Sequence, residues 1–340
     1  MSAGNRQVVL AARPAGAPKL GDFHLQETRR PEPGTGEMLI RTLWLSLDPY
    51  MRGRMNAQKS YAEPIPIGGV MEGGTVSVVE ASNHGDYAVG DIIVGRAGWQ
   101  EWGVSAGTGM RKIDPNAGPL SASLGVLGMP GMTAYTGLLN IGQPKAGETV
   151  VVAGASGAVG SVVGQIARIK GCRAVGVAGG AEKCAFTTGE LGFDACIDHR
   201  APDFANQLGA ACPDGIDVYF ENVGGPVLEA VFPLMNMWGR MPVCGMISHY
   251  NDTAPSPGPN MLPKAMMLIL TRRLTLRGFI VSDYTSQLDD FLRDVGGWVR
   301  EGRIRYREDV LDGLDKAPEG LIGLLQGNNF GKLVVKVAEL

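Results

Sequence analysis

The stretch "VVVAGASGAVGSVVGQIA" at 150–167 limits the possible folds of this chain more than any other part of it. Its unbroken apolar start is typical of a strand that is buried on both faces of a sheet. Three glycines then predict a tight turn, and apolar side chains after the turn recur at the spacing of one helix face. These side chains are Val159, Val162, Val163 and Ile166. Strand, turn and helix together predict one unit of a parallel sheet covered by helices.

Strand-like and helix-like runs continue to alternate after this stretch. The runs "RAVGVAGG", "GIDVYFENVGG" and "RMPVCGMI" predict strands. The runs "AEKCAFTTGELG", "DFANQLGAACP" and "VLEAVFPLMNMWG" predict helices. This β-α-β-α-β order predicts a doubly wound parallel sheet. The proline-rich "APSPGPN" at 254–260 predicts a loop.

The first 128 residues have a different texture. Short β-like runs such as "QVVLAAR", "EMLIRTLWLSL", "GGTVSVVEAS" and "DIIVGRAGWQEWGVS" are separated by Gly and Pro turns. The chain has 340 residues, and a single core rarely grows beyond about 250–300. We therefore predict an α/β protein with a β-rich first domain and a second domain that contains the parallel sheet. The final run, "LVVKVAEL", predicts a strand that can return to the first domain.

Composition and charge exclude several other classes of protein. A net charge of −3 gives no electrostatic reason to expect nucleic acid or an anionic membrane as partner. No window approaches the about 18 apolar residues of a membrane span, and the first residues lack the apolar core of a signal peptide. Five cysteines without a CxxC spacing argue against a disulfide framework or a structural zinc site. We expect a reduced, cytoplasmic protein without a metal.

The glycine turn also predicts a binding site. Gly157 would let the backbone approach a pyrophosphate, and Gly160 would let the following helix pack on the strand. The helix N-terminus would then face the negative charge. Ala155 stands where the first glycine of the dinucleotide-binding pattern is expected, and glycine turns of this kind also occur for structural reasons alone. The position between a strand and a helix favours a dinucleotide.

The end of the second strand favours one nucleotide over the other. NAD-binding proteins place an acid here for the adenine ribose, but this strand ends in Gly179 and Gly180, and Glu182 is displaced. Without that carboxylate there is less repulsion against a 2′-phosphate, and Lys183 adds attraction. We therefore expect NADPH. The alternative is that Lys183 is an ordinary exposed lysine of the helix.

Several motifs, in order along nearly the whole chain, resemble those of one family. They are "LSLDPYMRGRM", "GMPGMTAYTGL", the glycine turn with "RAVGVAGGAEKC", "ENVGG", "CGMISHYN", "RGFIV" and "GNNFGKLVVKV". The chain resembles the zinc-independent medium-chain dehydrogenase/reductases, in the group of prostaglandin reductases, leukotriene dehydrogenases and the alkenal, enone and curcumin reductases. This resemblance implies a GroES-like catalytic domain at 1–128 and 309–340, and a Rossmann domain at 129–308.

The resemblance also implies an activity and a set of binding residues. The activity is NADPH-dependent reduction of a carbon–carbon double bond next to a carbonyl, in a small hydrophobic α,β-unsaturated aldehyde or ketone, by a homodimer. The implied contacts run from the pyrophosphate and 2′-phosphate to the nicotinamide. They involve Gly157, Ala158, Val159, Gly160, Gly179, Lys183, Asn222, Cys244, Gly245, Tyr250, Phe279, Ile280, Val281 and Asn329. His199 is a departure, because relatives often carry a tyrosine there.

Metal-free reduction of an enone needs a donor for the carbonyl oxygen, where negative charge develops. Tyr250 follows a predicted strand at the edge of the sheet where ligands bind, so it is the first candidate to orient or protonate the substrate. Tyr50, in "DPYMRGRM", is the second candidate and would face the same cleft. The alternative for Tyr50 is a tyrosine that braces a turn. We expect Arg52 and Arg54 to pair locally rather than to bind substrate.

Two other functions remain open at this point. A quinone reductase of the same superfamily would share the cofactor site and differ only in the acceptor. A protein that binds NADPH without turnover would share the fold, because fold alone does not define function.

Overall fold

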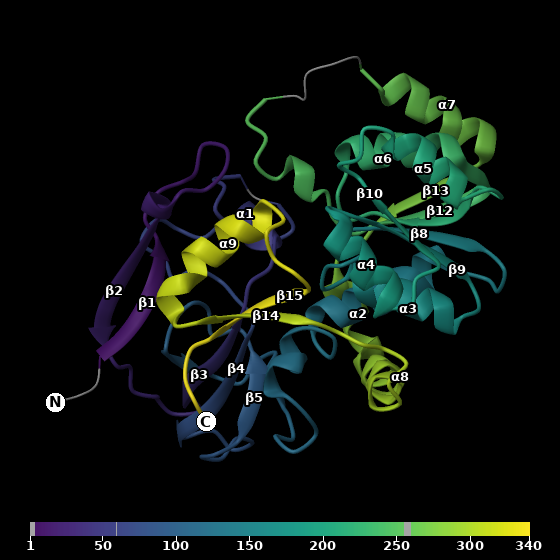
Figure 1. The fold of residues 1–340 in the computed structure, drawn as a ribbon. Helices are drawn as coiled ribbons and strands as arrows, with labels where there is room; N and C mark the ends of the chain where they lie inside the picture. Colours follow the sequence, from purple (N-terminus) through teal and green to yellow (C-terminus); the bar gives the residue numbers. More distant parts are fainter. Residues whose placement is uncertain (1–3, 59, 255–259) are drawn as a thin grey trace.

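The computed structural model describes residues 4–58, 60–254 and 260–340. Figure 1 shows two lobes, one rich in strands and one in which helices surround a central sheet. The strand-rich lobe combines the first strands of the chain with the last ones. Most of the loop predicted at 254–260 lies outside the described residues. No helix within the described ranges is long and apolar enough to cross a membrane.

The central sheet of the second lobe has six parallel strands in the order β10-β9-β8-β11-β12-β13. The first three strands along the chain run outward in one direction, and the next three run in the other. In sheets of this kind, ligands bind in the crevice outside the carboxyl ends of the strands where the order reverses, which here is beside β8 and β11. The strands are β8 (Thr149–Ala153), β9 (Arg173–Ala178), β10 (Ala195–Asp198), β11 (Ile216–Phe220), β12 (Met235–Val243) and β13 (Thr275–Gly278).

Helices cover both faces of this sheet, as Figure 1 shows. The apolar face predicted for the first helix is the face that α3 buries against the sheet, since Val162, Val163 and Ile166 are at most 1% exposed. One face carries α2 (Met129–Thr136), α3 (Gly160–Ile169), α4 (Ala181–Gly189) and α8 (Leu288–Arg300). The other carries α5 (Phe204–Ala211), α6 (Gly225–Val231) and α7 (Leu262–Arg272). The predicted α/β class with a doubly wound parallel sheet is confirmed.

The strand-rich lobe contains a seven-stranded sheet in which the C-terminal strands join the N-terminal ones. β15 pairs with β3 in antiparallel fashion and with β14 in parallel fashion. Buried Trp99 and Met51 belong to the core under this sheet. Its strands are β3 (Met38–Ser46), β4 (Thr75–Ser82), β5 (Ile92–Gly95), β6 (Trp102–Ser105), β7 (Arg111–Lys112), β14 (Glu308–Asp312) and β15 (Lys332–Lys336). The hairpin of β1 (Gly4–Leu10) and β2 (Phe23–Arg29), with helices α1 (Tyr50–Arg54) and α9 (Ala317–Leu325), completes the lobe. The domain boundaries 128/129 and 308/309 stay a prediction.

One local prediction is wrong, and one strand was missed. The run "VLEAVFPLMNMWG" is not one helix, because α6 ends at Val231, a short 3-10 turn contains Pro233, and β12 begins at Met235. Proline lacks the N–H that would continue the helical hydrogen bonds. The strand β2 was not predicted, since its sequence "FHLQETR" is mostly polar and its exposed side chains hide the β pattern.

Candidate active site

The glycine turn joins β8 to α3 in the predicted way. The backbone N–H of Gly157 donates to the carbonyl of Gly154 over 2.9 Å, and Ala158 and Val159 lead into the helix. A Cβ atom at Gly160 would lie 2.2 Å from the same Gly154 carbonyl oxygen, so no larger residue fits without moving the turn. The turn therefore brings backbone to the N-terminus of α3, where an anionic group is favoured.

A cavity of about 330 Å³ opens at the carboxyl end of β9. Its wall combines the turn after β9, the start of α4, the residue after His199 and the loop that follows α9. The lining residues are Gly179, Gly180, Ala181, Glu182, Lys183, Arg200, Gly327 and Asn328. A Cβ at Gly179 would lie 2.9 Å from the Nε2 atom of His199 and 3.2 Å from the Nε atom of Arg200, so glycine keeps this wall open.

Two cationic side chains, Lys183 and Arg200, face this cavity. Burial and the neighbouring Arg200 lower the pKa of Lys183, and burial followed by Arg200 lowers the pKa of His199. Asp198 fixes the turn, because it accepts hydrogen bonds of 2.9 Å from the N–H groups of Gly180 and Arg200. Sequence reasoning missed Arg200. Its signal was a cation two residues beyond the end of the third strand, beside the departure already noted at His199.

The loop at 327–331 lies over both the glycine turn and this cavity. Lys183 Nζ donates to the carbonyl of Gly327 over 2.7 Å, and Gly157 forms a parallel β-bridge with Gly331. Phe330 packs on Phe186 of α4, with ring centroids 4.9 Å apart. The loop therefore joins the strand-rich lobe to the glycine turn and α4 of the other lobe.

Asn329 belongs to this loop. Its side-chain Nδ2 donates to the carbonyl of Gly331 over 2.8 Å, so Asn329 shapes the loop from within.

A buried carboxylate organises the turn "ENVGG" after β11. Glu221 accepts hydrogen bonds from the N–H groups of Val223 and Gly224 over 2.5 and 2.8 Å, and from the Tyr219 hydroxyl over 3.0 Å. Burial nevertheless raises the pKa of Glu221. Asn222, the next residue, donates through Nδ2 to the carbonyl of Ala153 over 2.8 Å. The turn is thus fastened to the end of β8, beside the glycine turn.

The segment after β12 lies next to this turn. The N–H groups of Cys244 and Gly245 both donate to the Glu221 carbonyl, over 2.9 and 3.2 Å. Tyr250 follows the 3-10 turn Ile247–His249, and its hydroxyl lies over Gly245, where a Cβ would be 2.9 Å away. Burial raises the pKa of Tyr250, so the hydroxyl keeps its proton at neutral pH. Burial also raises the pKa of Cys244 to about 12, which fits a packing residue rather than a nucleophile.

The segment after β13 packs against the end of β11. Phe279 is buried and its ring lies edge-on to Phe220 and Tyr284, with centroids 6.3 and 6.2 Å apart. Its side chain therefore belongs to the core. Ile280 and Val281 are half-buried and follow directly.

The motif "DPYMRGRM" forms α1 and the residues beside it. Arg52 donates to Asn251 Oδ1 over 3.0 Å, so α1 contacts the residue that follows Tyr250. The guanidinium of Arg54 lies 5.6 Å from the Tyr50 ring and 4.4 Å from the Tyr61 ring, and it pairs with Glu72 over 3.3 Å. Burial and Asp48 raise the pKa of Tyr50 above its ordinary value.

Tyr61 was not identified from the sequence. Its side chain is 59% exposed, and its charged form would raise the pKa of Tyr250, so the two tyrosines are electrostatic neighbours. Tyr50 and Tyr61 are therefore linked through Arg54. The loop that carries Tyr61 had no sequence signal beyond its glycines and prolines.

These features fit a dinucleotide with a phosphate on the adenosine ribose. Gly157 and Gly160 leave backbone open beside a helix N-terminus, which suits a pyrophosphate. Lys183 and Arg200 supply two cations at one cavity, which suits a 2′-phosphate on the ribose better than a 2′-hydroxyl. Within the described residues, no group of three His, Cys, Asp or Glu side chains is arranged to hold a metal ion.

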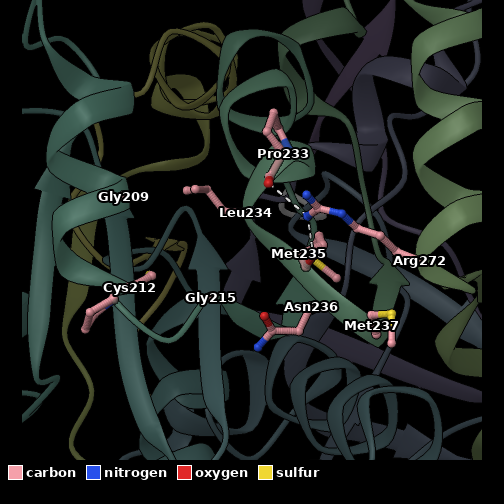
Figure 2. Close-up of a pocket in the computed structure, with 10 residues that line it drawn as sticks. Gly209, Cys212, Gly215, Pro233, Leu234, Met235, Asn236, Met237 and Arg272 are labelled. Atoms are coloured by element: carbon pink, nitrogen blue, oxygen red, sulfur yellow. Dashed lines mark hydrogen bonds between the residues drawn. The ribbon is translucent and has the colours of Figure 1, made fainter.

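A second hollow, of about 510 Å³, lies away from all of these residues (Figure 2). It opens near the start of β12, and Arg272 reaches into it from α7 and donates to the carbonyls of Pro233 and Met235. None of the predicted site residues lines it. The hollow is thus separate from the candidate site.

Comparisons with known proteins agree with this site. Residues 6–113 match the family model described as the N-terminal domain of oxidoreductase, and residues 158–295 match the model described as zinc-binding dehydrogenase. The second description refers to zinc, but the described residues of this chain contain no metal-binding cluster.

Individual relatives cover nearly the whole chain. An NADPH-dependent curcumin reductase of Escherichia coli K12 is 56% identical over 98% of this chain and 97% of its own length. A 2-alkenal reductase (NADP(+)-dependent) of Nicotiana tabacum is 40% identical over 98% of both chains. The crystal structure of CurA in complex with NADPH from Vibrio vulnificus is 52% identical, with a TM-score of 0.95, over 98% of this chain and 100% of that one.

Identity of this extent, together with the site, shows the family. The chain belongs to the medium-chain dehydrogenase/reductases, in the zinc-independent group that contains the curcumin, prostaglandin and alkenal reductases.

Proposed function

We propose that this protein reduces the carbon–carbon double bond of α,β-unsaturated aldehydes and ketones with NADPH. Two features of one lobe carry this proposal: a cavity with two cations at the end of β9, and a protonated tyrosine near the carboxyl end of β12. The first suits NADPH, and the second suits an acceptor that needs a hydrogen-bond donor. The relatives' names, which refer to curcumin and 2-alkenals, support the class of acceptor.

Bound NADPH supplies the hydride that adds to the β-carbon of the substrate. Negative charge then develops on the carbonyl oxygen, and the chain must provide a donor for it. Tyr250 can do so, because burial raises its pKa and keeps the hydroxyl protonated. A Cβ at Gly245 would lie 2.9 Å from this hydroxyl, so glycine leaves room for it.

The substrate side of the crevice is proposed to come from the strand-rich lobe. The rings of Tyr50 and Tyr61 both lie close to the Arg54 guanidinium. Both rings are apolar surfaces with a polar end, which suits a hydrophobic carbonyl compound. Arg52 holds α1 against Asn251 and thereby sets the distance between the two sides.

The cofactor contacts are proposed as follows. Gly157, Ala158, Val159 and Gly160 would surround the pyrophosphate, while Lys183, Arg200 and Gly179 would surround the 2′-phosphate. Asn222, Cys244, Gly245, Ile280 and Val281 would line the path to the nicotinamide. Phe279 would support that path from the core, and Asn329 would shape the loop that covers it.

The decisive experiment measures the oxidation of NADPH by the purified protein with a medium-chain 2-alkenal, and NADH and a simple quinone are tested in parallel. We expect turnover of the alkenal with NADPH and formation of the saturated aldehyde. Turnover of the quinone alone would assign the protein to the quinone reductases. Tight binding of NADPH without turnover of any acceptor would contradict the catalytic proposal and leave a cofactor-binding protein.

We further propose a homodimer that forms through the edge of the six-stranded sheet. β13 is the last strand of the sheet and is exposed along its whole length. An exposed edge strand offers unpaired backbone groups to another chain. The neighbouring α7 carries exposed apolar side chains, and Figure 1 shows it on the side of this lobe away from the other lobe. These side chains are Leu262, Met266, Met267 and Leu270.

The division into domains at 128/129 and 308/309 is proposed because β14 and β15 join the N-terminal sheet, although β14 begins at Glu308, one residue before the second boundary. A cytoplasmic location is proposed because all five cysteines are free thiols, as is usual in a reducing compartment.

A further inference from the structure

Two thiols meet beside the cavity at the end of β9. The Sγ atoms of Cys184, in α4, and Cys196, in β10, lie 3.0 Å apart. A disulfide requires about 2.05 Å between the sulfurs, so an approach of about 1 Å would close the bond. Both thiols are half-buried and so keep part of their surface accessible. The backbone on each side is already fixed, because Cys196 pairs with Gly176 of β9 and the N–H of Cys184 donates to the Gly180 carbonyl.

The two thiols differ in acidity. The hydrogen bond from Cys196 lowers the pKa of Cys184, while the same bond and burial raise the pKa of Cys196. Burial raises the pKa of the buried Cys172 and Cys212 to about 11. Cys184 is therefore the most acidic of these thiols. An acidic, accessible thiol next to a second thiol is the usual arrangement of a redox-sensitive pair.

We propose that Cys184 and Cys196 form a site of reversible oxidation by hydrogen peroxide. The Cys184 thiolate attacks one peroxide oxygen, the O–O bond breaks, and hydroxide leaves, so Cys184 becomes a sulfenic acid. The Cys196 sulfur then attacks Cys184 Sγ, expels the sulfenic oxygen as water and gives up its proton. In total, two thiols are oxidised and one peroxide is reduced to two waters. A dithiol reductant reverses the step by exchange.

The sequence around the pair makes the bond easy to map. Trypsin cleaves after Lys183 and Arg200 and releases 184–200, which contains both cysteines. A protease specific for glutamate then cleaves after Glu190 and separates them. The purified protein is treated with hydrogen peroxide, alkylated, digested with both enzymes and analysed by mass spectrometry with and without reduction.

We expect fragments 184–190 and 191–200 to stay joined until they are reduced. Cys184 should be oxidised at least about tenfold faster than Cys212, because one unit of pKa changes the thiolate fraction tenfold. In Cys196→Ser, a sulfenic-acid reagent should label Cys184. In Cys184→Ser, Cys196 should stay reduced, and Cys212→Ala should leave the joined fragments unchanged.

The proposal is overturned if both cysteines are still free to be alkylated after peroxide treatment, so that the two fragments separate without reduction. It is also overturned if Cys196 is oxidised to the same extent in Cys184→Ser as in the unmodified protein. The mapping on the unmodified protein needs no variant, so a variant that does not fold leaves the test intact. The readout is thiol chemistry and does not depend on the proposed reductase activity.

Discussion

Two cations set the charge of the cavity at the end of β9, and each should contribute to nucleotide selection. Removing Lys183 or Arg200 deletes one charge-assisted contact to a phosphate, worth about 1.5–3 kcal/mol. We expect Lys183→Ala and Arg200→Ala each to raise the KM for NADPH about ten- to hundredfold. The KM for NADH should change little, because NADH has no phosphate there. Steady-state kinetics with both cofactors measures the ratio.

The matched control is Lys19→Ala, at an exposed lysine of the strand-rich lobe that lies between β1 and β2 and does not line the cavity. It should behave like the unmodified protein. Equal loss of both cofactors in Lys183→Ala would mean that the lysine supports the loop at 327–331 rather than the phosphate, since Lys183 also donates to the Gly327 carbonyl.

Tyr250 leads to a second prediction at the scale of one residue. Tyr250→Phe removes the proposed donor and should lower kcat with an enone about a hundredfold or more. The dissociation constant for NADPH should stay the same. Burial raises the pKa of Tyr250 above 10, its ordinary value, so its protonated form persists to that pH. We therefore expect no loss of rate from this group as the pH rises from neutral toward 10.

Tyr50→Phe is the comparison for that variant. If Tyr50 only lines the substrate, its loss should raise KM and leave kcat nearly unchanged. A kcat for Tyr250→Phe equal to that of the unmodified enzyme would remove Tyr250 from the chemistry.

Several of these residues could be predicted from the sequence, and others could not. The glycine turn and Lys183 have fixed positions relative to one strand and one helix, so local pattern was sufficient. Arg200 and Tyr61 reach the site from other segments, through the end of β10 and through an irregular loop. Their side chains carry no periodicity, and only the fold shows where they point.

At the scale of elements, the turn after β11 depends on one buried carboxylate. Glu221→Ala would leave the N–H groups of Val223 and Gly224 without their acceptor, at a cost of about 1–3 kcal/mol for each buried group. We expect a clear loss of stability in thermal or urea unfolding and weaker NADPH binding. Glu221→Gln should lose much less, because both N–H groups donate to the same oxygen, Oε1, and the amide oxygen of glutamine can take its place.

The same carboxylate predicts a pH dependence of stability. Its folded pKa is raised above the ordinary value of 4.5, mainly by burial. The native state therefore holds a proton that the unfolded chain releases, and the contribution of this group is complete below pH 4.5. It is lost as the pH rises through the folded pKa. Glu221→Gln should lack this part of the pH profile, and an identical profile for both proteins would contradict the assignment.

Elements with strong apolar periodicity were predicted well, and those that depend on tertiary pairing were not. Strand β8 and helix α3 follow directly from their apolar pattern. Strand β12 was hidden in a run that reads as helical up to Gly239, because pairing with β11 and β13 decides its conformation. The polar β2 is likewise defined by its partner β1.

At the scale of the whole molecule, the two lobes are joined by contacts that no local pattern contains. Arg52 and Asn251 are 199 residues apart, and Lys183 and Gly327 are 144 apart. The first contact lies beside Tyr250, and the second lies beside the cavity at the end of β9. The lobes therefore meet where the two halves of the proposed site must be assembled, and closure of the site is a property of the full chain.

The proposed dimer belongs to the same scale and can be tested on α7. Leu270 is 70% exposed, and an aspartate there would place a charge within an apolar contact. We expect the unmodified protein to sediment as a dimer and Leu270→Asp to sediment as a monomer at micromolar concentration. The control is Leu20→Asp, at a leucine that is 55% exposed in the strand-rich lobe, which should stay dimeric. A dimer for Leu270→Asp would place the interface elsewhere. A monomer for the unmodified protein would end the proposal, and the edge strand and the apolar helix would then be exposed without a partner.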